Sequence, residues 1–199
     1  MPRKHPKNKD ETRKEIIRKS REVISKMGFK KTSTEEIAKS LNKTKSALYH
    51  YFENREEILK AVIHYEGEQV KQSILQVIRN ETNPRKQLEV FFMNRAKSVF
   101  RLWNFYKSII EEYFLRYSFI WMSLDNYNLE EQKILEDILQ EGIDQKLFFI
   151  PDVSLTARSV IKMMRGFDFF IFQGEKYKEI QSDLAEILRI FIDGISTNK

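Results

Sequence analysis

The chain contains no cysteine among its 199 residues. This absence excludes disulfide bridges, cysteine-based zinc sites and a thiol nucleophile. Only six glycines and four prolines are present, which disfavours a turn-rich all-β fold and favours long helices. No apolar run approaches the roughly 20 residues that a membrane-spanning helix needs, and the polar N-terminus lacks the apolar core of a secretory signal. We therefore expect an all-α, cytoplasmic protein with no membrane partner.

Sequence motifs of catalysis are missing as well. The patterns G-x-x-x-x-G-K-[ST], G-x-G-x-x-G and G-x-S-x-G do not occur. His64 and Glu68 stand four residues apart, but two side chains do not make a metal site. We therefore expect no enzyme, no bound metal and no cofactor.

The charge of the chain is unevenly distributed. Residues 1–55 hold 16 Lys and Arg against 7 Asp and Glu, whereas the remainder holds 19 against 22. A basic segment of this kind can neutralise nucleic-acid phosphates. Apolar residues recur through it at helical spacing, so it is interpreted as a folded module rather than a solubilising tail.

The pattern of apolar and capping residues predicts about nine helices. They are expected over 10–27, 34–41, 45–52, 55–79, 84–101, 104–117 and 128–146, followed by two C-terminal helices. Gly28 and Asn42 suit left-handed turns, Thr34, Thr44 and Asn54 suit helix caps, and Asp152 or Ser154 can cap a later helix. Three short helices with a tight turn between the second and third predict a helix-turn-helix unit.

This organisation predicts three segments. Residues 1–9 are expected to form a flexible basic arm, and residues 10–55 the helix-turn-helix DNA-binding domain. Residues 56–199 are expected to form a larger helical domain for effector binding and dimerisation. The helix over 55–79 connects the two domains.

The segment from residue 28 to residue 59 resembles the TetR family of bacterial transcriptional regulators. The resemblance rests on Gly28-Phe29, Thr34, Ile37-Ala38, Leu48-Tyr49, Tyr51-Phe52 and Glu56-Glu57-Ile58-Leu59. Their order and spacing match that family over about 45 residues, whereas residues 84–199 match only in outline. The turn that is usually A-G-V-S in the family is Leu41-Asn42-Lys43-Thr44 here, which affects the DNA sequence preference.

A recognition helix presents polar side chains to base edges in the major groove. Lys45, Ser46 and His50 lie opposite the apolar face of their helix, and hydroxyls at helix N-termini suit phosphate. By the resemblance, Tyr49 contacts backbone phosphate. The full set of predicted DNA-binding residues is Thr34, Lys43, Thr44, Lys45, Ser46, Tyr49, His50 and Arg55.

Twelve aromatic residues fall within residues 91–127 and predict an apolar effector pocket, although plain core packing is an alternative for each. The predicted pocket comprises Phe100, Trp103, Tyr106, Tyr113, Phe114, Tyr117, Trp121, Met163, Phe167 and Phe170. Arg95, Arg101 and Arg116 can meet an anionic ligand group, and Glu111 and Glu112 a cationic one. The sequence does not choose between these two kinds of small molecule.

The last two helices carry apolar stripes that, by the resemblance, pair with those of a second copy. The predicted dimer residues are Val160, Met164, Ile171, Leu184, Leu188 and Phe191; the alternative is that both stripes are used within one subunit. The resemblance implies a homodimeric repressor, released from a double-stranded palindromic operator by a small molecule. Alternatives are a nucleoid or division-associated DNA binder without an effector, and a protein-interaction module with a vestigial helix-turn-helix.

Overall fold

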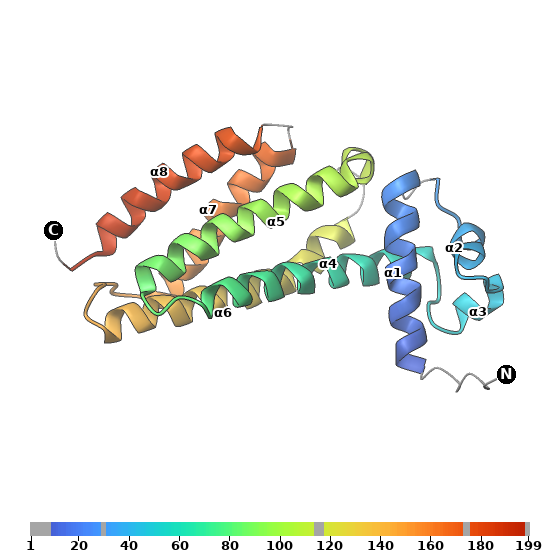
Figure 1. Ribbon diagram of the computed structural model, residues 1–199, viewed down its shortest axis with the longest axis horizontal. Coiled ribbons are helices and arrows are strands. Elements are labelled where there is room, and N and C mark those ends of the chain that lie inside the picture. The colour runs from blue at the N-terminus through green and yellow to red at the C-terminus, as the bar shows by residue number, and fades with distance from the viewer. Residues whose placement is uncertain (1–8, 29–30, 114–117, 173–175, 198–199) are drawn as a thin grey trace. The chain divides into compact units, whose positions relative to one another are not determined.

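The computed structural model describes residues 9–28, 31–113, 118–172 and 176–197, and the side chains of 104–128, 169 and 172 are outside that description (Figure 1). Within these residues the regular secondary structure is helical, apart from one isolated bridge between Phe148 and Ser196, which confirms the all-α fold. The eight helices are α1 (Lys9–Met27), α2 (Thr34–Ser40), α3 (Lys45–Tyr49), α4 (Arg55–Ile78), α5 (Pro84–Tyr113), α6 (Ser118–Asp144), α7 (Val153–Phe172) and α8 (Tyr177–Ile195). None of the described helices is long and apolar enough to cross a membrane.

The helix count differs from the expected nine in the middle of the chain. The helices expected over 84–101 and 104–117 form the single helix α5, and the one expected from residue 128 begins earlier, at Ser118. Residues 85–141 contain neither Gly nor Pro, so nothing in the backbone chemistry ends a helix near residue 102. The third helix is also shorter than expected, because it ends at Tyr49 rather than Phe52.

Two compact units make up the chain. The first comprises Met1–Glu66 and Phe105–Ser123, and the second comprises Gly67–Asn104 and Leu124–Lys199. The first unit thus reaches beyond residue 55, where we expected the DNA-binding domain to end, and takes in a stretch that we assigned to the second domain.

The first unit has a small apolar core. From α1 it takes Ile16 and Ile24, which are fully buried, and from α2 it takes Ile37. Each such side chain contributes roughly 1.5–3 kcal/mol when it leaves water. Met27, the last residue of α1, is exposed.

The second unit has the larger core, to which α4–α8 all contribute. Its fully buried centre includes Phe91 and Phe92 of α5, whose rings meet edge to face with centroids 5.7 Å apart. Leu135 and Leu139 of α6 and Leu184 of α8 belong to the same cluster. Figure 1 shows helices α5–α8, most of whose residues belong to this unit, as the green to red ribbons.

A buried charge cluster links three helices of the second unit. The Arg95 guanidinium of α5 donates two 2.9 Å hydrogen bonds to the Asp168 carboxylate of α7 and one of 2.7 Å to Glu131 of α6. Burial alone would lower the pKa of Arg95, but the two carboxylates outweigh it and hold that pKa above its ordinary value. Arg95, which we considered for an anionic ligand, is therefore already engaged by two anions.

The C-terminal end of α8 is joined to the turn between α6 and α7. The Phe149 N–H donates to the Ile195 carbonyl at 2.7 Å, and the Thr197 N–H donates to the Leu147 carbonyl at 3.1 Å. Arg85 at the start of α5 adds a 2.7 Å bond to the Ser196 hydroxyl. We call these bonds the C-terminal seam.

Candidate nucleic-acid interface

The connection from α1 to α2 is fixed by a glycine turn and two hydrogen bonds. Gly28 has φ 76°, a left-handed conformation that glycine adopts without strain. The buried Thr32 hydroxyl donates to the Gly28 carbonyl at 2.8 Å. Arg55 in turn donates to the Thr32 carbonyl at 3.2 Å, so this predicted DNA-binding residue braces the connection.

Helix α2 begins with a capping box, one residue earlier than we expected. The Ser33 hydroxyl accepts from the Glu36 N–H at 3.2 Å, and the Glu36 carboxylate accepts from the Ser33 N–H at 2.6 Å. This reciprocal pair satisfies two backbone donors at the helix start. Our assignment of the cap to Thr34 was wrong, because Thr34 is the first helical residue and is buried.

The turn between α2 and α3 is a Schellman motif. Asn42 has φ 52°, and its N–H donates to the Lys39 carbonyl at 3.1 Å, while the Lys43 N–H donates to the Ala38 carbonyl at 2.9 Å. These bonds satisfy carbonyls at the end of α2 and set the angle at which α3 begins. The left-handed conformation expected at Asn42 is thus confirmed.

Helix α3 buries one side and presents the other to water. The Thr44 hydroxyl caps it by accepting from the Ala47 N–H at 3.2 Å. Leu48 is almost fully buried, whereas Ser46, Tyr49 and His50 are exposed. The polar side chains that we predicted to reach bases are therefore accessible on one short, capped helix.

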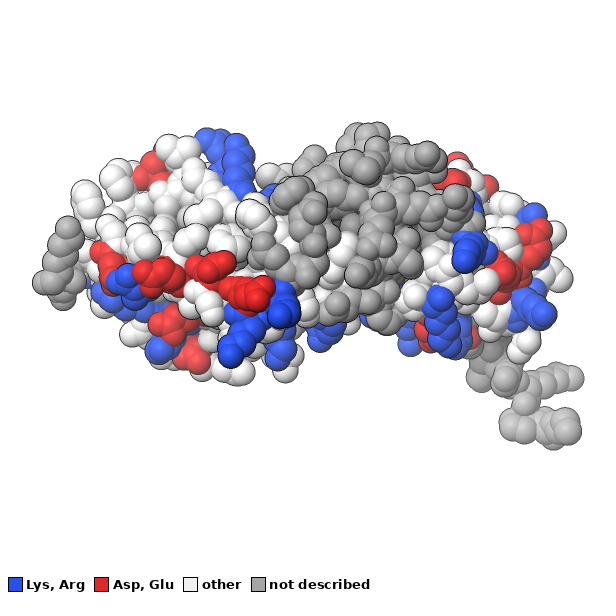
Figure 2. All heavy atoms as spheres, turned by 90° about the horizontal axis from the view of Figure 1, so that it is seen from above, with Lys and Arg blue, Asp and Glu red and all other residues white. Residues whose placement is uncertain are grey.

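Lys45, the first residue of α3, has a partner on α2. Its ammonium donates to the Glu35 carboxylate at 2.5 Å and lies 6.0 Å from the centroid of the Tyr49 ring. The hydrogen bond lowers the pKa of the Glu35 carboxyl and raises the pKa of the Lys45 ammonium. Figure 2 shows that charges of both signs intermingle on the face of this unit that it presents.

Most of the predicted DNA-binding residues are on α3 or beside it, whereas two others are less accessible. Lys43 and Thr44 lie in the turn that leads into α3, next to the exposed residues of that helix. Thr34 is buried, and Arg55 is half-buried at the start of α4. Sequence reasoning missed Ser33, although the Ser-x-x-Glu pattern of a capping box was readable, and it missed Glu35, whose partner is ten residues away. The expected arm lies outside the described residues except for Lys9, which begins α1.

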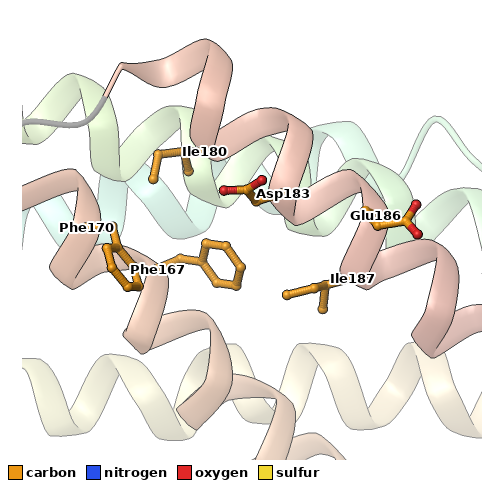
Figure 3. Close-up of a pocket in the computed structure, with 6 residues that line it drawn as sticks. All are labelled: Phe167, Phe170, Ile180, Asp183, Glu186 and Ile187. Atoms are coloured by element: carbon orange, nitrogen blue, oxygen red, sulfur yellow. The ribbon is translucent and has the colours of Figure 1, made fainter.

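An apolar hollow of about 380 Å³ opens between α7 and α8 (Figure 3). Phe167 and Phe170 project into it from α7, facing Ile180 and Ile187 of α8. Two residues of the predicted effector pocket thus line one hollow. Asp183 and Glu186 add carboxylates to its lining.

The other predicted pocket residues are distributed differently. Trp103 is buried, Met163 packs against the core cluster, and the Phe100 ring lies 5.1 Å from that of Tyr177. The side chains of Tyr106, Tyr113, Phe114, Tyr117 and Trp121 lie outside the described residues. Within the part of the chain that the structure describes, no three His, Asp or Glu side chains gather as metal ligands would.

The predicted dimer residues lie in or against the core of the single chain. Val160, Met164, Ile171, Leu184 and Leu188 are buried within the single chain, and Phe191 packs against its core. All six side chains therefore contribute to packing within one subunit. Among the described side chains of α7 and α8, the large apolar ones that are exposed are Leu155, Phe170 and Ile190.

Comparison with known proteins agrees with this geometry. The family model of bacterial regulatory proteins, tetR family, matches residues 16–62. The uncharacterized HTH-type transcriptional regulator YuxN of Bacillus subtilis (strain 168) is 32% identical over 88 residues. That match covers 42% of this chain and only 30% of the length of YuxN.

Solved structures share the fold over most of the chain. A transcriptional regulator from Cytophaga hutchinsonii ATCC 33406 superposes with a TM-score of 0.79 at 19% identity, covering 92% of this chain and 98% of that one. AibR, solved in complex with isovaleryl coenzyme A and operator DNA, superposes with a TM-score of 0.57 at 22% identity, covering 88% of this chain and 96% of its own. The family match over residues 16–62 shows that this segment is a helix-turn-helix of the kind found in bacterial regulatory proteins of the tetR family, and the solved structures show that their fold extends over most of the chain.

Proposed function

We propose that this protein is a dimeric, sequence-specific DNA-binding transcriptional regulator. The observation that carries the proposal is the set of exposed polar residues on and beside α3, which are Lys45, Ser46, Tyr49 and the C-terminal cap His50, while Leu48 is buried. A helix with this division can enter the major groove while its apolar side stays on the domain. The caps on α2 and the Schellman turn hold α3 in a fixed orientation, as base recognition requires.

Phosphate contacts would come from the surroundings of α3. Lys43 and Thr44 precede the helix, and the Tyr49 hydroxyl is a neutral donor beside them. The excess of basic residues in the first 55 positions supplies the long-range attraction. Base edges would then be read by Lys45, Ser46 and His50.

The dimer would form through the outer face of α7 and α8. Phe170 is 47% exposed and Ile190 is 57% exposed, and the hollow beside Phe167 offers a recess for side chains of a second copy. A two-fold dimer would carry two α3 helices to half-sites about one DNA turn, ~34 Å, apart. This interface replaces the buried stripes that the sequence suggested.

The regulator would be a repressor that a small molecule releases from a palindromic operator. The aromatic residues of the second unit support an apolar or amphipathic effector, and AibR binds both an acyl-coenzyme A and operator DNA on a similar fold. An effector that prefers a state with altered spacing of the two α3 helices would lower operator affinity by a coupling of about 1–3 kcal/mol.

DNA binding is tested by fluorescence anisotropy on duplexes from the gene's own upstream region, against a scrambled duplex. We expect tighter binding to the native sequence, with a steep salt dependence. Tyr49→Phe and Lys45→Ala should each weaken it, whereas Tyr177→Phe and Lys162→Ala, which change the same residue types in the second unit, should not. Equal, weak binding to both duplexes, and to duplexes selected from a random pool, would contradict the proposal.

The dimer is tested by sedimentation velocity on the 23.9 kDa chain. Ile190→Glu places a charge in the proposed interface and should shift the protein toward monomer. Leu129→Glu makes the same kind of change at a residue of α6 that is 66% exposed, so it should leave the dimer intact. Dissociation by both variants, or by neither, would argue against this interface.

A further inference from the structure

The Glu35–Lys45 pair joins the N-terminal ends of the two helices of the helix-turn-helix. Glu35 stands in the first turn of α2 and Lys45 is the first residue of α3, and their side chains meet at 2.5 Å. Neither side chain is buried, since 61% of Glu35 and 45% of Lys45 is exposed. The carboxylate of the neighbouring Glu36 takes part in the capping box, whereas the carboxylate of Glu35 pairs with Lys45.

This contact changes what Lys45 offers to DNA. A free lysine on a DNA-binding face gains affinity by displacing a counterion from a phosphate, whatever the base sequence. A lysine that already neutralises a carboxylate has no unbalanced charge to supply. Exposed ion pairs of this kind contribute little free energy and exchange easily, so the pair can yield to a better partner.

Base edges are such a partner. Guanine presents two acceptors, O6 and N7, in the major groove, and the lysine ammonium carries three N–H donors. Lys45 lies beside Tyr49 at the N-terminal end of α3, the part of a recognition helix that reaches bases. A correctly placed guanine therefore offers Lys45 two fixed acceptors, whereas a phosphate on non-specific DNA competes with Glu35 for the same positive charge.

We propose that Glu35 is a specificity-determining residue, which neutralises Lys45 on non-specific DNA and releases it only to base acceptors at the operator. This inference rests on the proposed function, because it presumes that α3 is the recognition helix. Glu35 itself would contact no base. Its effect would be to lower the affinity for wrong sequences more than the affinity for the right one.

The test is the salt dependence of non-specific binding, measured by anisotropy on a 30-base-pair mixed-sequence duplex between 50 and 200 mM NaCl. Wild type and Lys45→Ala should have the same slope, because Lys45 is already neutralised. The salt slope of Glu35→Gln should be steeper by about 0.9 per DNA-binding head. Between 50 and 200 mM NaCl this corresponds to about a threefold greater loss of affinity per head. Adding Lys45→Ala to Glu35→Gln should restore the wild-type slope.

Glu22→Gln is the matched control. Glu22 forms a similarly exposed pair with Lys19 on α1, at 2.8 Å, so its replacement changes the net charge of the same unit by the same amount. Its slope should equal that of wild type. On a duplex selected for tight binding, Glu35→Gln should lower the ratio of specific to non-specific affinity several-fold.

Three results would overturn the inference while wild type still binds DNA. These are a Glu35→Gln slope equal to that of wild type, a Glu22→Gln slope as steep as that of Glu35→Gln, and a loss of slope in Lys45→Ala alone. Absence of wild-type binding to any duplex would instead refute the proposed function, and this inference with it. Circular dichroism of each variant establishes that the helices are intact.

Discussion

Replacement of Arg95 by methionine should destabilise the second unit severely. Only 5% of the Arg95 side chain is exposed, and the two carboxylates it serves are 12% and 16% exposed. Arg95→Met removes the cation from which both Glu131 and Asp168 accept hydrogen bonds. Removing one partner of a buried ion pair costs about 3–5 kcal/mol, a large part of the roughly 5–15 kcal/mol that stabilises a typical domain.

The three members of the cluster should not be equivalent. Asp168→Asn leaves the Arg95–Glu131 pair, which is neutral overall, and weakens only the bonds to α7, so we expect a loss of about 1–3 kcal/mol. A triple variant that combines Arg95→Met, Glu131→Met and Asp168→Leu removes all three charges. It should recover most of the stability lost in Arg95→Met, because apolar residues of similar volume often replace buried ion pairs without loss.

The assay is urea unfolding followed by circular dichroism, with tryptophan fluorescence as a second probe. With a slope of about 2 kcal/mol per M, Arg95→Met should lower the midpoint by about 2 M. An Arg95→Met variant within about 1 kcal/mol of wild type would refute the reasoning. So would an Asp168→Asn variant as unstable as Arg95→Met, because the order of the two follows from the charges left behind.

Three further predictions concern single contacts. A Cβ at Gly142 would lie 1.9 Å from the Phe148 ring, whereas one at Gly166 would meet nothing within 4 Å. In thermal unfolding, Gly142→Ala should therefore lower the free energy of unfolding by about 1–3 kcal/mol. Gly166→Ala should raise it by about 0.5–1 kcal/mol. Ser33→Ala should cost about 1 kcal/mol in the first unit by loss of the capping box, and Ser182→Ala, whose hydroxyl bonds within α8, should cost little in the same assay. Burial raises the pKa of the Tyr177 hydroxyl above its ordinary value of 10.0. Its contribution to stability is therefore complete below pH 10.0 and is lost as the pH rises through the folded-state pKa. Between pH 9 and pH 11, Tyr177→Phe should lose less unfolding free energy than wild type, and equal losses would contradict this.

Local signals explain why the helix-turn-helix was predictable from sequence. Gly28, Asn42, Thr44 and Asn54 each act on the few residues around them, and their chemistry specifies a turn or a cap. The same reach explains the error at Thr34, because Ser33 beside it is an equally good cap and only Glu36 decides between them. The prediction placed a break between two helices near residue 102, although no helix-breaking residue stands there, and the structure has the single helix α5 instead.

Longer-range features required the structure. An apolar stripe such as Leu184 and Leu188 indicates that one face of the helix is buried. It does not indicate whether that face packs against the same chain or against a second copy. Arg95 resembled a ligand contact because no periodicity connects it to Glu131 and Asp168, which lie 36 and 73 residues away. Glu35 and Lys45 meet across a turn, where spacing rules within one helix do not apply.

The C-terminal seam has a consequence for the order in which the second unit folds. Its bonds join residues that are far apart in the chain, and the one between Arg85 and Ser196 closes a separation of 111 residues. Loop-closure entropy makes such contacts late events, whereas neighbouring helices can pair early. We therefore expect the seam to be absent from the folding transition state and to open first on the way out of the native state, so that it governs how fast this unit unfolds far more than how fast it folds.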